Sequence, residues 1–284
     1  MIERTAAAAC RTAVLLLMLA VALITGPACG QHASLPAEDG AAKGLVDRVP
    51  RACAATGCVF LDAAALRDHF QGIYAGYRDA FRLLGDYGID FDDVDQMACA
   101  GLSLFLLEGR FDPDRVREEL GARDYVRAAY LGEEVWQGAA AGLEDWVALL
   151  NGVLVAGYRD SVIDCLEVMV EGEDSLPVHP DVAGVVERLP AGLDMSVAAL
   201  ALDNPILAHG ESLQRVDDAT LRLTVVRKYA DPAAAAEGAG QIAPDMQDLL
   251  SHGLRDVQVQ REDQFVTLQA EVAPAAIASG MAGA

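Results

Sequence analysis

The sequence predicts an α+β fold in which largely antiparallel sheets carry helices packed on one face. Apolar or alternating runs of strand length recur along the chain, and helical stripes with apolar residues three and four apart lie between them. The dipeptide Asn151-Gly152 is a strong signal for a two-residue hairpin between two of these strands. Hydrophobic residues make up 53% of the 284 positions, so the chain can bury a large core.

The N-terminus has the three zones of a secretory signal sequence in the usual order. Arg4 and Arg11 supply positive charge, residues 13–24 form an apolar run, and small residues then lead to Ala28. The apolar run is too short to span a bilayer, which takes about 20 residues. We therefore expect residues 1–28 to be a signal peptide that is cleaved on export.

Cys29 is preceded by small residues and begins a polar, flexible tether over residues 29–50. In these features it resembles the lipidated cysteine of bacterial lipoproteins. The resemblance implies an extracytoplasmic protein of the cell envelope, held on a membrane by an acyl anchor at Cys29. The alternative is an ordinary secretory cut after Ala28, which would leave a freely secreted chain.

The composition is strongly acidic. The chain has 21 basic and 43 acidic side chains, which give a net charge of -22. Such a surface repels nucleic acid and anionic lipid headgroups alike. We therefore expect no nucleic-acid partner, and a membrane contact only through the acyl anchor.

An N-terminal α+β half is expected over residues 51–175. Its first helix follows a short strand and carries a stripe of apolar residues. Its second helix begins at Asp112-Pro113, because the aspartate can cap free amides while proline costs no hydrogen bond in the first turn. The expected elements are strands over 59–61, 97–107, 125–130, 134–137, 146–150 and 153–156, and helices over 63–84, 113–120 and 159–169.

A C-terminal α+β half is expected over residues 176–284. Asp231-Pro232 repeats the helix-start signal, and a helical region around Met246, Leu249 and Leu250 follows it. Both halves share the order strand, Asp-Pro, helix and two strands, which predicts two related strand-helix-strand-strand units or a shared supersecondary preference. The other expected elements are a helix over 180–189 and strands over 195–202, 220–229, 257–260 and 264–272.

A strand, a turn and a helix meet at Gly109, Phe111 and Asp112. Through this pattern and the signal sequence, the chain resembles uncharacterised bacterial secreted or envelope lipoproteins that contain a domain of unknown function. The resemblance implies an exported protein without assigned chemistry, and it carries over no catalytic residue.

Four cysteines follow Cys29, and in an oxidising compartment they allow three disulfide pairings. We expect a disulfide between Cys53 and Cys58, because the short segment between them can close a tight loop. Cys99 and Cys165 would then pair with each other or stay buried and reduced.

Asp90, Asp92, Asp93 and Asp95 bring four carboxylates together in one short segment, which makes them a candidate calcium site. Their spacing lacks the central glycine and the final glutamate of a helix-loop-helix calcium loop. An acidic turn whose aspartates cap neighbouring backbone is therefore the favoured interpretation. No other metal site is predicted.

The segment over residues 208–212, which we expect to be a loop, holds His209, Glu211 and Ser212 and so combines base, acid and nucleophile types. Ser212 does not lie in a Gly-x-Ser-x-Gly elbow, and neighbours in sequence seldom form a triad. Zinc and phosphate-loop motifs are also missing from the sequence. We therefore expect no cofactor and assign no catalytic residue.

Together these observations predict a non-enzymatic extracytoplasmic binding or scaffold protein. Its partner would be an envelope protein or an apolar ligand. Two alternatives remain open. One is a secreted hydrolase whose site assembles only in the fold, with His209 or His179 beside a carboxylate. The other is a calcium-dependent adhesion module.

Overall fold

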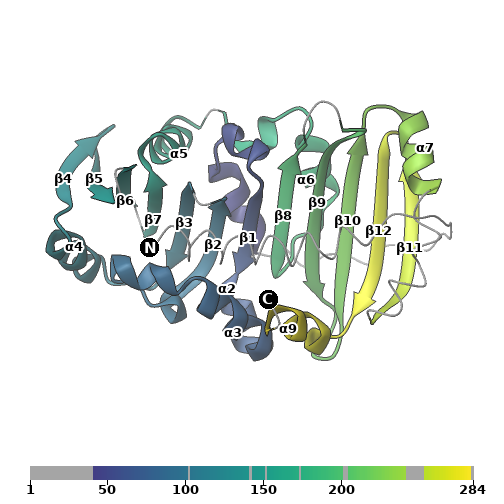
Figure 1. Cartoon of the computed structure of the whole chain (residues 1–284), viewed down its shortest axis with the longest axis horizontal. Coiled ribbons are helices and arrows are strands. Elements are labelled where there is room, and N and C mark those ends of the chain that lie inside the picture. The colour runs from purple at the N-terminus through teal and green to yellow at the C-terminus, as the bar shows by residue number, and fades with distance from the viewer. Residues whose placement is uncertain are drawn as a thin grey trace.

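The computed structural model describes residues 41–101, 103–140, 143–150, 152–172, 174–200, 204–240 and 253–282. This part of the chain forms one sheet of twelve strands with helices packed against it (Figure 1). The strands are β1 (Cys58–Asp62), β2 (Val94–Ala100), β3 (Leu104–Gly109), β4 (Val126–Tyr130), β5 (Glu133–Ala140), β6 (Leu143–Leu150), β7 (Val153–Tyr158), β8 (Asp194–Ala199), β9 (Ile206–Arg215), β10 (Leu221–Tyr229), β11 (Leu254–Glu262) and β12 (Phe265–Val272).

The helices include short 3-10 segments as well as α-helices. The α-helices are α2 (Ala63–His69), α3 (Gln71–Ala80), α4 (Pro113–Ala122), α5 (Arg159–Glu171), α6 (Ala183–Arg188), α7 (Pro232–Gly240) and α9 (Pro274–Ala282). The 3-10 helices are η1 (Ala41–Arg48), η2 (Arg51–Ala55), η3 (Arg82–Tyr87), η4 (Phe91–Asp93) and η5 (Leu176–Val178). The fold is thus a mixture of helices and antiparallel strands, as the sequence predicts.

The order of strands across the sheet is β11-β12-β10-β9-β8-β1-β2-β3-β7-β6-β5-β4, and every neighbouring pair is antiparallel. Strands β1 to β7 form one side of the sheet and β8 to β12 the other. The two sides meet at the centre, where β1 pairs with β8. The expected boundary between residues 175 and 176 therefore falls between the segments that form these two sides.

Helices pack on both faces of the sheet, which corrects the expectation that they cover one face only. Along β1, Val59 and Leu61 belong to one core cluster, which includes α2, α3, α4 and α7. Cys58 and Phe60 belong to the other, which includes η1, η2, α5 and α6. Side chains of a strand point alternately to the two faces, so each cluster lies on its own face. The central strands read as continuous apolar runs because both of their faces are buried.

Several local signals in the sequence act as expected. The Asp112 carboxylate accepts a hydrogen bond of 2.9 Å from the amide of Asp114 at the start of α4. Asp231 caps α7 in the same way, accepting from the amides of Ala233 and Ala234 at 2.9 and 2.8 Å. Strands β6 and β7 form the expected hairpin, and Gly152 in its turn has a φ of 87°.

Other elements differ from the expectation. The segment 97–107 is a hairpin of β2 and β3 with a turn at Gly101, instead of one strand. The helix expected over 63–84 is interrupted at Phe70, whose φ of -135° and ψ of 62° are not helical. Residues 206–215, expected in part as a loop, form the buried strand β9. Helix α9 is an addition that the sequence pattern did not predict.

Within the described residues, none of the helices is both long and apolar enough to cross a membrane. The expected signal peptide, Cys29 and the expected helical region around Met246, Leu249 and Leu250 lie outside these residues.

Candidate functional site

Four ionisable side chains are buried together on β8, β9 and β10. Asp194, Glu211, Arg227 and His209 are 4%, 2%, 6% and 8% exposed. Charged side chains are seldom buried to this degree unless they are paired or serve a function. We refer to these four residues, with Tyr77 of α3, as the Glu211 cluster.

The alternation of β9 sets the direction of its side chains. His209 and Glu211 lie two residues apart and share the face of Leu213, which belongs to the cluster of α3 and α7. Gly210 faces α6, where an added Cβ would lie 2.7 Å from Val185 Cγ1. A side chain at position 210 would therefore push α6 away from β9, so glycine allows the strand and the helix to pack closely.

The strand register brings the members of the cluster together. His209 pairs with Ala198 of β8 on one side and with Arg227 of β10 on the other. Glu211 pairs with Ser196 of β8, and Asp194, two residues earlier on that strand, is its diagonal neighbour. Diagonal neighbours on one face of a sheet are within reach of long side chains.

Hydrogen bonding in the cluster is incomplete. The Tyr77 hydroxyl donates to Asp194 Oδ2. Among the described residues, Asp194 Oδ1 and both carboxyl oxygens of Glu211 are buried without a hydrogen-bond partner. Native proteins pair nearly all such buried atoms, so each exception calls for an explanation, and an ion, water or ligand is one of the recognised ones.

Burial changes the pKa of the two carboxyl groups and of the imidazole in this cluster. It raises the pKa of Glu211 to about 8, with Asp194 adding to the rise and Arg227 opposing it. It raises the pKa of Asp194 to about 6, against the Tyr77 hydrogen bond. Burial, with Arg227 nearby, lowers the pKa of His209 to about 4. At neutral pH the free cluster therefore holds a protonated Glu211 and a neutral His209.

The same alternation separates the residues that suggested a hydrolase. Ser212 points to the opposite face from His209 and Glu211, and its hydroxyl donates to the Pro190 carbonyl oxygen at 2.7 Å. His179 lies elsewhere, where its Nδ1 accepts from the amide of Asp181 at 3.3 Å. These contacts give Ser212 and His179 structural roles.

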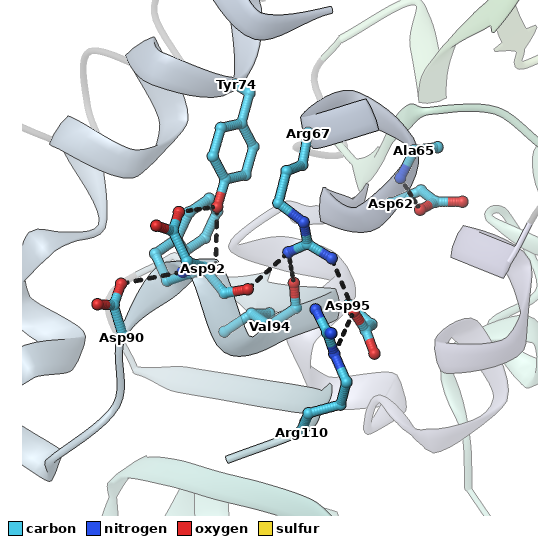
Figure 2. A network of polar contacts seen from close by, with 10 residues as sticks. Asp62, Ala65, Arg67, Tyr74, Asp90, Asp92, Val94, Asp95 and Arg110 are labelled. Carbon is cyan, nitrogen blue, oxygen red and sulfur yellow. Dashed lines mark hydrogen bonds and ion pairs between the residues drawn. The ribbon is translucent and has the colours of Figure 1, made fainter. Parts of the chain in front are cut away.

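Three of the four aspartates of the calcium candidate, Asp90, Asp92 and Asp95, contact other protein groups through their carboxylates (Figure 2). Asp90 Oδ1 accepts from the amide of Asp92 at 3.0 Å, and Asp92 Oδ1 accepts from the Tyr74 hydroxyl at 2.6 Å. Asp95 Oδ1 accepts from Arg67 at 3.0 Å and lies 3.6 Å from Nε of Arg110. We call this set the Arg67 network.

Arg67 also fixes the backbone of the turn. Its guanidinium donates to the carbonyl oxygens of Asp92 and Val94 at 2.8 and 3.1 Å, while the amide of Arg110 donates to the Asp93 carbonyl oxygen at 2.8 Å. The turn is thus an acidic segment stabilised by capping and by arginine. Across the described residues, no group of three or more His, Cys, Asp or Glu side chains is arranged to hold a metal ion.

The four cysteines beyond Cys29 are buried and form no disulfide with one another in this structure. Cys58 Sγ contacts the carbonyl oxygen of Cys53 at 3.5 Å, and Cys165 Sγ contacts that of Arg48 at 3.4 Å. Cys99 lies on the opposite face of the sheet from the other three. Burial raises the pKa of Cys53 to about 11, which disfavours a reactive thiolate. A disulfide between Cys53 and Cys58 in the oxidised protein stays a prediction.

The sequence and the fold were compared with those of known proteins. No protein-family model matches the sequence, and no curated protein matches it. A solved structure titled "Structure of crystal form IV of TP0453" matches with a TM-score of 0.48 and 12% sequence identity. The match covers 85% of this chain and 98% of that chain.

Sequence reasoning singled out His209 and Glu211 but placed them in a loop, and it missed Asp194, Arg227 and Tyr77. Arg227 interrupts the face of β10 that otherwise carries Leu221, Leu223, Val225 and Tyr229, and Asp194 is the first residue of β8. A charged residue at an inward position of a predicted strand is the signal that would have found them.

Proposed function

We propose that this chain is a non-enzymatic, extracytoplasmic binding protein, anchored to a membrane of the cell envelope through Cys29, and that the Glu211 cluster is its ligand site. The observation that carries the binding proposal is the pair of Glu211 carboxyl oxygens, buried without a hydrogen-bond partner. A ligand that donates hydrogen bonds to them would remove the cost of leaving them unpaired, which is about 1–3 kcal/mol for a buried polar group.

The neighbours of Glu211 support a ligand with an apolar body. Leu213, Leu223 and Val225 surround it on the same face of the sheet and belong to the larger core cluster. A molecule that reaches Glu211 must contact these side chains, so it must be apolar outside its polar head. This favours the apolar-ligand interpretation over a scaffold for another protein.

Co-purification tests the binding function. The protein isolated from its own host, extracted with organic solvent and analysed by mass spectrometry, should release one defined small molecule. The Glu211→Gln variant should release little of it. The control variant Glu118→Gln, at an exposed position on α4, should release as much as the wild type. A wild-type protein that carries no small molecule, or equal amounts in both variants, would contradict the proposal.

The intact mass of the membrane-extracted protein tests the anchor separately. We expect a chain that begins at Cys29 and carries a diacylglyceryl group. An unmodified chain beginning at Cys29 or later would make the protein freely secreted, without bearing on the ligand site.

We also infer that the two sides of the sheet are related units. In support, β1-β2-β3-β7-β6 is matched by β8-β9-β10-β12-β11 in the order of strands from the centre outward. In each unit an Asp-Pro helix, α4 or α7, follows the third strand. Superposition of the matched strands and helices in an experimental structure tests the relation, and strands that fail to overlap under one rotation would refute it.

A further inference from the structure

We propose that the Glu211 cluster binds the ammonium head group of an apolar molecule, and that the bound molecule replaces a proton on the cluster. This rests on the proposed binding function and names the class of ligand for the same site. The set of unpartnered atoms, the charge of the cluster and the protonation of Glu211 support this assignment.

The unpartnered atoms are acceptors, and there are three of them. They are Oε1 and Oε2 of Glu211 and Oδ1 of Asp194. An ammonium group has three N-H donors and no acceptor, so its bonding capacity matches this set. A carboxylate or phosphate head offers only acceptors and would be repelled by both acids. A divalent metal would want more ligands than the two carboxyl groups supply.

The charges of the cluster point to the same head group. Among the described residues, the titratable groups that face Glu211 are Asp194 of β8, His209 of β9, Arg227 of β10 and Tyr77 of α3. With both acids ionised and His209 neutral, Arg227 supplies a single positive charge against two negative ones. One further positive charge makes the cluster neutral. A neutral hydroxyl head could bond a carboxyl oxygen but would not supply that charge.

A proton supplies the missing charge in the free protein. Burial holds the pKa of Glu211 at about 8, so near pH 7 its carboxyl group is protonated. An ammonium ion beside it favours the carboxylate, and Glu211 then gives up its proton to solvent as the charge-assisted pair forms. The net change is the loss of one proton for each molecule bound, so binding should strengthen as pH rises from about 6 to 8.

Three probes that share a twelve-carbon chain test the head group: dodecylamine, dodecan-1-ol and dodecanoate, each below its micelle concentration at pH 7. Dodecylamine should raise the melting temperature of the protein and bind in calorimetry, whereas dodecanoate should not. Calorimetry in phosphate and in Tris, whose ionisation enthalpies differ, should report release of up to one proton per dodecylamine. Glu211→Gln should weaken dodecylamine binding by about tenfold or more, the usual effect of one buried charged hydrogen bond.

Two further variants keep the outcome clear. Glu118→Gln should bind dodecylamine as the wild type does. Asp194→Asn should weaken binding and reduce the number of protons released, because Asp194 adds to the rise in the pKa of Glu211. Circular dichroism at neutral pH checks that each variant is folded.

Equal stabilisation by dodecan-1-ol or dodecanoate, binding without proton release, or failure of dodecylamine to bind would each overturn the ammonium assignment. None of these results would remove the co-purified molecule expected from the host protein, so the binding function and the class of its ligand can fail separately.

Discussion

In the N-terminal half of the fold, Arg67 of α2 donates to Asp95 and to two backbone carbonyl oxygens, so the Asp95 carboxylate is paired at a place that water also reaches. In the C-terminal half, Glu211 is buried with both carboxyl oxygens unpartnered. A paired carboxylate adds to stability, whereas an unpaired buried one subtracts from it. The acidic turn around Asp95 therefore stabilises the fold, whereas the buried Glu211 destabilises it.

The largest expected effect comes from removing the ionisable group of the unpaired site. Folding raises the pKa of Glu211 from 4.5 to about 8. Its contribution to stability is therefore fully present below about pH 4.5 and is lost as pH rises through about 8. The loss in the free energy of unfolding should be on the order of 5 kcal/mol. Glu211→Gln should remove this part of the pH dependence and be more stable than the wild type at pH 8.5.

Urea unfolding at pH 5 and pH 8.5 measures this prediction. A smaller dependence from Asp194, whose pKa is about 6, should remain in the variant. Parallel pH profiles for the wild type and Glu211→Gln would contradict the assignment of the unpaired site.

A second variant removes the hydrogen bond that the buried cluster does have. Tyr77→Phe takes away the donor to Asp194, so an ionised Asp194 would be left without a partner. We expect a loss of about 2 kcal/mol above pH 6, and less below it where Asp194 is protonated. Tyr74→Phe, which removes a donor to the exposed Asp92, is the control and should cost less. Equal losses, or no change with pH for Tyr77→Phe, would argue against a cost that depends on burial.

Breaking the Arg67 network should lower the free energy of unfolding, whereas Glu211→Gln should raise it at high pH. Arg67→Met removes the bonds to Asp95 and to the Asp92 and Val94 carbonyl oxygens. We expect a loss of about 1–2 kcal/mol, reduced by partial exposure to solvent. Arg110→Met, which breaks a longer and more exposed ion pair to Asp95, should cost less. Urea unfolding at pH 7 measures both losses. If Arg67→Met raised the free energy of unfolding, the Arg67 network would not stabilise the fold.

The smallest effect concerns calcium. Since Asp90, Asp92 and Asp95 already accept hydrogen bonds or ion pairs from the protein, millimolar calcium should leave the melting temperature unchanged in the wild type and in Asp92→Asn. A calcium-dependent rise that Asp92→Asn abolishes would revive the adhesion-module hypothesis.

The sequence predicts the mixture of helices and antiparallel strands, because turn and cap signals are local. Asp112, Asp231 and the hairpin at Gly152 each act through atoms a few residues away. It does not predict β9, since His209, Gly210, Glu211 and Ser212 break the apolar pattern of a buried strand. Their burial depends on β8 and β10, which are distant in sequence, and so does the meeting of Asp194 with Glu211.

The distribution of helices over two faces was also beyond the local pattern. A continuous apolar run shows that a strand is buried but does not show which helices return to each face. Long-range packing also explains why the helix expected over 63–84 is interrupted at Phe70, whose side chain is buried in the core.

The central pairing of β1 with β8 bears on how a ligand could enter. Contacts cross this junction on both faces of the sheet: α3 packs against α9, and the amide of Leu176 donates to the Val49 carbonyl oxygen at 2.7 Å. Because contacts on both faces join the two sides of the sheet, they oppose hinge bending between these sides. Two-domain proteins, in contrast, close on their ligands by rigid-body motion. Access to Glu211 would then come from local opening of the elements over β9 and β10, on the timescale of loop and helix motions instead of domain closure.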